Sequence, residues 1–155
     1  MVPKKILCCT DFSENSQPAL QTAVEYANVF GASLVIAHVV DSWAGFPVYA
    51  EGMPVDVRTV VQDLENTARD QLETVEKEVR DKIDTVKTLA RVGIPAEEII
   101  RAAAEESADL IVMGTHGWTG LRHILLGSVA ERVLRGAGCP VLVVRSSPEN
   151  PATGR

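Results

Sequence analysis

The chain has 155 residues, of which 46% are hydrophobic and 23% are charged, enough to bury one globular core but short for two. Its formal net charge is -6, which argues against a general binder of nucleic acid or anionic membranes, because both need a basic surface. We therefore expect one domain over residues 1–145, followed by a flexible tail over residues 146–155. Neither nucleic acid nor a membrane is an expected partner, and an anionic ligand would need a local site.

Neither a secretory signal nor a membrane span is evident in the sequence. The N-terminal "MVPKKILCCTDF" lacks a long apolar region, and "LVIAHVV" is far shorter than the ~20 residues that a membrane-spanning helix needs. We therefore expect a cytoplasmic protein. Cys8, Cys9 and Cys139 have neither a CxxC pair nor a zinc-like spacing. They are predicted to be buried, reduced thiols, with a reactive Cys9 as the alternative.

Five short runs have the composition of β-strands, and three of them are apolar without interruption. Uninterrupted apolar runs are typical of strands in a parallel sheet that is covered on both faces. Residues 41–55, between the second and third runs, are rich in glycine, proline and aromatic residues, which favours a surface loop. The predicted strands cover residues 4–10, 33–40, 85–92, 109–114 and 140–145.

Helical patterns alternate with these strands. The first predicted helix has a proline in its first turn and ends at Gly31. The second covers residues 56–82, with an apolar stripe opposite an acidic face. The third begins at Pro95, and the fourth begins at Ser128, which is predicted to form a capping box with Glu131. This alternation predicts an α/β fold: a single-domain, doubly wound, five-stranded parallel sheet of the Rossmann-like type, with helices on both faces.

The stretch "VMGTHGWTGLRHILLGSV", from Val112 to Val129, follows the fourth predicted strand. Ligands of open parallel sheets bind beyond the carboxyl ends of the strands. Glycines in such a loop let backbone N–H groups approach an anion, and a helix that begins at Ser128 adds further N–H groups. The stretch contains no carboxylate, while His116 and Arg122 can add positive charge. It therefore favours phosphate binding, although glycines that only form turns remain the alternative.

The glycine spacing carries a resemblance to a known family. The common phosphate loops GxxxxGK[ST] and GxGxxG are absent, and the chain instead has Gly114, two residues, Gly117, nine residues, Gly127 and Ser128. This G-x2-G-x9-G-[ST] pattern, together with "KKILCCTDFSENS", "VGIPAEEII" and "CPVLVVR", resembles the ATP-binding branch of the universal stress protein family. The resemblance covers the chain apart from the loop after Asp41 and the tail. It implies a fold of the adenine-nucleotide-binding type.

The resemblance also implies roles for individual residues. Asp11 is expected to meet the ribose, with capping of the first helix as its alternative, and the backbone of Val39 is expected to meet the adenine edge. Cys9 stands where the family often has proline or a small apolar residue, so the contact beneath the adenine stays open. Mg²⁺ is expected on the phosphates. The expected nucleotide contacts are Cys9, Thr10, Asp11, Val39, Gly114, Thr115, His116, Gly117, Trp118, Thr119, Gly120, Arg122, Gly127, Ser128, Val129 and Ala130.

The implied function is a nucleotide-dependent switch or sensor that binds ATP, or ADP or AMP, with at most slow hydrolysis. The family commonly forms homodimers through the last strand, here from Pro140 to Arg145. Two alternatives remain: an ATPase or adenylyl-transfer enzyme, and a dimeric interaction protein with a purely structural glycine loop. No catalytic residue is assigned, because His38 is predicted to be a structural core residue and His116 has no neighbouring carboxylate or paired nucleophile.

Overall fold

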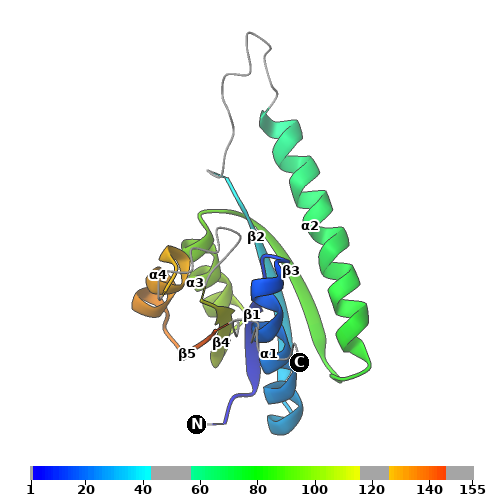
Figure 1. The fold of residues 1–155 in the computed structure, drawn as a ribbon, viewed down its shortest axis with the longest axis vertical. Helices are drawn as coiled ribbons and strands as arrows, with labels where there is room; N and C mark the ends of the chain where they lie inside the picture. Colours follow the sequence, from blue (N-terminus) through cyan, green and yellow to red (C-terminus); the bar gives the residue numbers. More distant parts are fainter. Residues whose placement is uncertain (1, 43–56, 116–125, 146–155) are drawn as a thin grey trace, which may run out of the picture.

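The protein folds around a five-stranded parallel sheet with helices on both faces, as its computed structural model shows (Figure 1). The structure describes residues 2–42, 57–115 and 126–145. Along the chain the elements are β1 (Lys5–Cys9), a 3₁₀ turn η1 (Glu14–Ser16), α1 (Gln17–Phe30), β2 (Ser33–Asp41), α2 (Val57–Arg80), β3 (Val86–Gly93), α3 (Pro95–Glu105), β4 (Leu110–Gly114), α4 (Ser128–Gly136) and β5 (Val141–Val144).

The strand order is β3-β2-β1-β4-β5, and every neighbouring pair is parallel. The chain winds outward from β1 through β2 to β3, and then returns to the other side of β1 for β4 and β5. The direction of winding therefore reverses between β1 and β4, which is where ligands of doubly wound sheets bind. This architecture confirms the predicted α/β fold.

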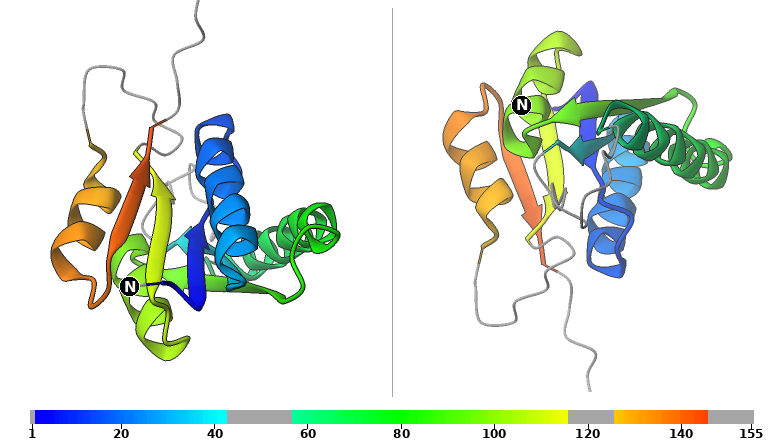
Figure 2. Two further views of the ribbon diagram at one scale, coloured as in Figure 1. Left: turned by 90° about the horizontal axis from the view of Figure 1, so that it is seen from below. Right: turned by 90° about the horizontal axis from the view of Figure 1, so that it is seen from above.

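Helices cover both faces of the sheet (Figure 2), and an apolar core lies on each face. Ile6 and Cys8 of β1 pack with residues of α1 and α2, whereas Leu7 and Cys9 pack with residues of α3 and α4. Successive side chains of a strand point to opposite faces, so a strand covered on both sides must be apolar at every position. The uninterrupted apolar runs in the sequence have this cause.

The predicted helices are confirmed in number and order, with differences at their ends. Gly31 ends α1 in the left-handed conformation, with φ of 63°, and α3 begins at Pro95 as predicted. The apolar stripe of α2 is buried at Ala68 and Leu72, but Leu64 is 45% exposed. The predicted loop over residues 41–55 begins one residue later, because β2 extends through Asp41. Residues 43–56 and the predicted tail lie outside the described residues.

The predicted capping box at the start of α4 is wrong. Gly127, with φ of -71° and ψ of 155°, is the N-cap, and Ser128 is already the first helical residue. No side chain caps this end of the helix. The Glu131 carboxylate instead accepts a hydrogen bond from Arg135 one turn later, at 2.7 Å. The helix thus begins one residue earlier than the capping box requires. Ser128 is therefore not the N-cap residue, whose hydroxyl would accept a hydrogen bond from a backbone N–H.

Candidate functional site

A cavity of about 710 Å³ opens beyond the carboxyl ends of β1, β2 and β4, at the point where the winding reverses. Its size is typical of small-molecule sites. Helices α2, α3 and α4 contribute to its walls. The predicted contacts that line it are Cys9, Thr10, Asp11, Val39, Gly114, Thr115, Gly127, Ser128, Val129 and Ala130. The others, His116, Gly117, Trp118, Thr119, Gly120 and Arg122, lie outside the described residues and stay predictions.

Two backbone hydrogen bonds link Thr115, just after β4, to the end of β5 and to the start of α4. The Thr115 N–H donates to the Val144 carbonyl at 3.1 Å, and the Gly127 N–H donates to the Thr115 carbonyl at 2.8 Å. The two ends of the glycine-rich segment are thereby held together at the cavity wall. Because the Gly127 N–H is used in this contact, the N–H groups that this helix start can offer to an anion are those that follow it.

The first turn of α4 supplies such N–H groups. The Glu131 N–H closes the first intrahelical bond, to the Gly127 carbonyl at 2.9 Å. Helix geometry therefore leaves the N–H groups of Ser128, Val129 and Ala130 directed out of the N-terminal end. All three residues line the cavity. A helix N-terminus carries a partial positive charge, so this wall favours a phosphate group.

Another wall of the cavity contains a backbone edge of β2. Along this strand the hydrogen-bonding direction alternates: Ser33 bonds toward β1, with its N–H on the Lys4 carbonyl, and Leu34 bonds toward β3, with its N–H on the Thr85 carbonyl. Val39 lies an even number of residues after Ser33, so its N–H and carbonyl also point toward β1. The pairing of β1 with β2 ends at Cys9 and Ala37. The backbone of Val39 therefore faces the cavity just past the end of β1.

The turn after β1 carries Asp11 at the cavity wall. One oxygen of its carboxylate accepts hydrogen bonds from the Ser13 N–H at 3.0 Å and from the Ser13 hydroxyl at 2.5 Å. Such an aspartate turn fixes the local backbone. The N-cap of α1 is Ser16, so Asp11 does not cap this helix, and the alternative role that the sequence allowed is excluded.

His38 of β2 lies at the same wall and is half-buried rather than fully enclosed. Its Nδ1 lies 2.8 Å from the Thr10 carbonyl oxygen, and its ring packs on Phe12 with 4.4 Å between ring centroids. Burial lowers the pKa of His38, while the Thr10 hydrogen bond and the Asp11 charge oppose this shift. The structural role predicted for His38 is therefore supported, but its place on the cavity was missed.

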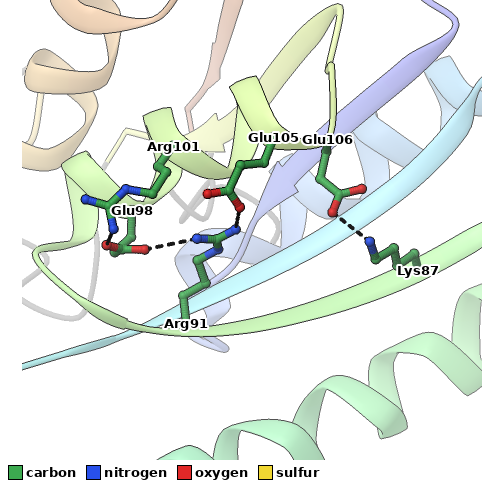
Figure 3. A network of polar contacts seen from close by, with 6 residues as sticks. All are labelled: Lys87, Arg91, Glu98, Arg101, Glu105 and Glu106. Carbon is green, nitrogen blue, oxygen red and sulfur yellow. Dashed lines mark hydrogen bonds and ion pairs between the residues drawn. The ribbon is translucent and has the colours of Figure 1, made fainter.

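A network of charged side chains fixes the wall formed by α3 (Figure 3). Glu98, only 8% exposed, accepts hydrogen bonds from Arg91 of β3 at 3.3 Å and from Arg101 at 2.7 Å. Arg91 also pairs with Glu105, which is the main cause of the raised pKa of Arg91 and the lowered pKa of Glu105. These contacts hold the first turn of α3 on β3, and with it Pro95 in the cavity wall.

Cys9 lines the cavity but keeps its proton. Burial raises the pKa of the Cys9 thiol well above its usual value, with Cys8 adding to the shift, and burial raises the pKa of Cys8 to about 12. A protonated thiol is a poor nucleophile, so the alternative of a reactive Cys9 gains no support. All three cysteines are free, as predicted, but Cys139 is only half-buried.

Sequence reasoning missed several cavity residues, some of them within the stretches that carry the family resemblance and others in α2, which has no motif. The helix α2 contributes residues that its hydrophobic periodicity assigned either to the core or to solvent. Nothing in the local sequence marks them as residues of a cavity. Within residues 2–42, 57–115 and 126–145, no three His, Cys, Asp or Glu side chains form a group that could hold a metal ion. The missed lining residues are Phe12, Ser16, Ala37, His38, Val40, Asp41, Leu64, Thr67, Ala68, Gln71, Pro95, Ile99 and Met113.

Comparison with known proteins decides the family, because the universal stress protein family matches residues 3–145. The chain belongs to the universal stress protein family. A relative, universal stress protein MJ0531 of Methanocaldococcus jannaschii, is 42% identical over 144 residues, which cover 92% of this chain and 82% of the relative. Across the described part of the chain, the structure has no helix that combines the length and the apolar character of a membrane span.

Solved structures of the family share the fold. The structure of protein MJ0577, also from Methanocaldococcus jannaschii, has a TM-score of 0.76 and 33% sequence identity, and the match covers 96% of this chain and all of that one. A universal stress protein in complex with cAMP has a TM-score of 0.63 and 26% identity, over 95% of this chain and 100% of that one. An adenine nucleotide is therefore a ligand of a family member with this architecture.

Proposed function

We propose that the protein binds ATP, or ADP or AMP, and acts through its nucleotide occupancy as a switch or sensor in a stress response. The observation that carries the proposal is that one cavity has the Val39 backbone edge at one wall and the first turn of α4 at another. The edge of adenine has both a hydrogen-bond donor and acceptors, which suits a strand N–H and carbonyl. The helix N-terminus suits the phosphates. The family member with bound cAMP supports an adenine nucleotide as the ligand.

The other predicted contacts have complementary roles in this proposal. Asp11 accepts hydrogen bonds from the ribose hydroxyls, and Cys9 lies beneath the base. Gly114 and Thr115 begin the segment that surrounds the ribose and phosphates, and it continues through the predicted contacts of residues 116–122. A Mg²⁺ ion would be bound by phosphate oxygens and water, as Mg²⁺ commonly is in nucleotide sites.

The main rival is an ATPase or adenylyl-transfer enzyme. Backbone N–H groups stabilise the ground state and the transition state alike unless another group activates water. The Nδ1 of His38 is already bonded to the Thr10 carbonyl, and the thiol of Cys9 is protonated. We therefore expect turnover of ATP far below the ~10 s⁻¹ typical of dedicated enzymes. Rapid turnover by the purified protein, abolished in His116→Ala while binding persists, would establish the enzyme instead.

Substitution of Gly127 tests the binding site directly. In Gly127→Val the backbone conformation is accessible to valine, but the branched side chain projects at the cavity wall beside the N–H groups of Ser128 and Val129. We expect the affinity for ATP to fall by about 2–4 kcal/mol, the scale of lost charge-assisted hydrogen bonds. Isothermal titration calorimetry measures this change.

Gly138→Val is the matched control. An added Cβ at Gly138 meets no atom within 4 Å, and this residue is not among those that line the cavity. The control should bind ATP as the wild type does. Undiminished binding by a folded Gly127→Val protein would exclude the proposed phosphate site. The rival with a purely structural glycine loop is tested by native mass spectrometry, since it predicts that no nucleotide co-purifies with the protein.

A further inference from the structure

The turn that carries Asp11 has an unfavourable backbone conformation. Phe12, the next residue, has φ of 63°, and among the described residues only Phe12 and Ser107 combine a side chain with a positive φ. For a bulky residue this left-handed conformation is strained. It persists only where surrounding contacts impose it. Asp11 therefore occupies its place because other groups hold the residues next to it.

One side chain, His38, contacts the residue on each side of Asp11. Its Nδ1 lies 2.8 Å from the Thr10 carbonyl, and its ring packs on the Phe12 ring at 4.4 Å. A carbonyl oxygen can only accept, so Nδ1 carries the proton and donates. This fixes the ring as the Nδ1–H tautomer when it is neutral.

The turn has further contacts, one to β2 and others within itself. The Thr10 N–H donates to the Ala37 carbonyl of β2 at 2.9 Å. The Phe12 N–H donates to the Thr10 hydroxyl at 3.0 Å, and the hydroxyls of Thr10 and Ser16 lie 3.1 Å apart. These bonds join neighbours in the chain and shape the turn. His38 extends the contact with β2 past the Thr10 N–H, because its side chain reaches the Thr10 carbonyl and the Phe12 ring on either side of Asp11. Its contacts relate the turn to the strand whose Val39 backbone faces the same cavity.

We propose that His38 is a positioning residue, which holds the Thr10–Phe12 turn so that the Asp11 carboxylate can discriminate a ribose from a deoxyribose. This role rests on the proposed function, in which Asp11 accepts from the ribose hydroxyls. Asp11 and His38 both line the cavity, and the imidazole acts without touching the nucleotide. Loss of the Thr10 contact would release the strained turn and move the carboxylate, while the first turn of α4 would stay in place.

Two substitutions separate the two contacts of His38. His38→Phe keeps a ring against Phe12 but loses the donor to Thr10, whereas His38→Asn keeps a donor near the Nδ1 position and loses the ring. The measurement is the ratio of the dissociation constants for 2′-deoxy-ATP and ATP. We expect the wild type to prefer ATP about tenfold or more, as one hydrogen bond to a charged group allows. Asp11→Ala should abolish this preference.

In His38→Phe the preference should fall toward unity while the affinity for 2′-deoxy-ATP changes little, and His38→Asn should restore part of it. The double variant Asp11→Ala/His38→Phe should lose no more preference than Asp11→Ala alone. In the wild type, ¹⁵N NMR of the imidazole should show Nδ1 protonated and Nε2 bare, a measurement that needs no substitution.

Three results would overturn this role. The first is an Nε2–H tautomer of His38 in the wild type. The second is an unchanged preference for ATP in a folded His38→Phe protein. The third is an equal loss of affinity for ATP and 2′-deoxy-ATP in His38→Phe, which indicates a general structural effect. A wild type that binds both nucleotides equally would also exclude it. Failure of the wild type to bind ATP at all would instead overturn the proposed function itself.

Discussion

Gly93, the last residue of β3, shows how a single position fixes a wall of the cavity. Its φ is 155°, which disfavours any residue with a side chain, and a Cβ placed there would lie 2.8 Å from Cγ of Glu98. Glu98 cannot easily move aside, because Arg91 and Arg101 both donate to its carboxylate (Figure 3). The absence of a side chain at Gly93 thus leaves room for Glu98, the buried carboxylate of the ion network, in the first turn of α3.

We predict that Gly93→Ala destabilises the protein by about 1–3 kcal/mol, the combined scale of backbone strain and a displaced buried contact. Chemical denaturation measures the change as a lower midpoint. Gly138→Ala is the control, since an added Cβ there meets open space, and it should leave stability nearly unchanged. Equal midpoints for the two variants would show that the connection between β3 and α3 accepts a side chain at Gly93 without loss of stability.

At the scale of elements, a carboxylate joins the amino ends of two neighbouring strands. Asp109, just before β4, accepts hydrogen bonds from the backbone N–H groups of Lys4 and Lys5, at 2.8 and 3.0 Å. These backbone hydrogen bonds, first that of Lys4 and then that of Lys5, lower the pKa of Asp109 below its usual value of 3.8. The contact aligns β1 and β4, the two strands between which the winding reverses.

This lowered pKa predicts a dependence of stability on pH. Because the folded state binds the proton less tightly than the unfolded state, the contribution of Asp109 is complete above about pH 3.8 and is lost as the pH falls through the folded pKa. Asp109→Asn removes the titration. Between about pH 5 and about pH 3, the free energy of unfolding should therefore fall more steeply for the wild type than for the variant. Parallel slopes would mean that the carboxylate does not titrate differently on folding.

The elements themselves could be predicted from the sequence, because their signals are local. Burial on both faces makes β4 and the first half of β2, residues 34–37, continuously apolar. Gly31 ends α1 because it adopts a positive φ at little cost. The start of α4 could not be predicted to the residue. The pattern of Ser128 and Glu131 fits a capping box, but Gly127 takes the extended N-cap position and Glu131 pairs with Arg135.

Part of the candidate site could be predicted for the same reason, and part could not. Gly127 and Ser128 belong to a motif with fixed spacing, and both lie at the cavity. Thr67 and Gln71 of α2 also line it, but their contribution depends on how α2 crosses the end of the sheet, and no short-range pattern encodes that crossing. His38 was assigned to the core because its neighbours on the strand are apolar.

At the scale of the whole molecule, β5 forms an edge of the sheet. The carbonyls of Pro140 and Val144 accept hydrogen bonds from Ile111 and Thr115, on the side of β4. Because the bonding direction alternates along a strand, the N–H and carbonyl of Val143 point to the open edge. An edge of this kind is a template for pairing with another chain. The homodimer through the last strand, which the family resemblance implies, stays a prediction, and this edge is where the two copies of β5 would pair.

We predict that Val143→Pro is a folded monomer. Proline removes the outward N–H and adds its ring at the edge, while the bonds to β4 come from the residues on either side. Val143→Thr, which keeps the N–H and the branched shape, should remain dimeric. Light scattering measures the mass of each protein in solution. A dimeric Val143→Pro protein would place the contact between subunits on another surface.

The hydrogen bond between Gly127 and Thr115 has a consequence for how the chain tolerates insertions. Residues 115 and 127 are adjacent in space although eleven residues separate them in the sequence. The entropy of closing a loop grows only with the logarithm of its length, by about 0.6 kcal/mol for each doubling. Chain closure alone therefore does not require a particular number of residues here, and under the proposed function the G-x2-G-x9-G-[ST] spacing reflects contacts with the ligand. Evolution and engineering can alter what this segment recognises without rebuilding the helix end that faces the ligand.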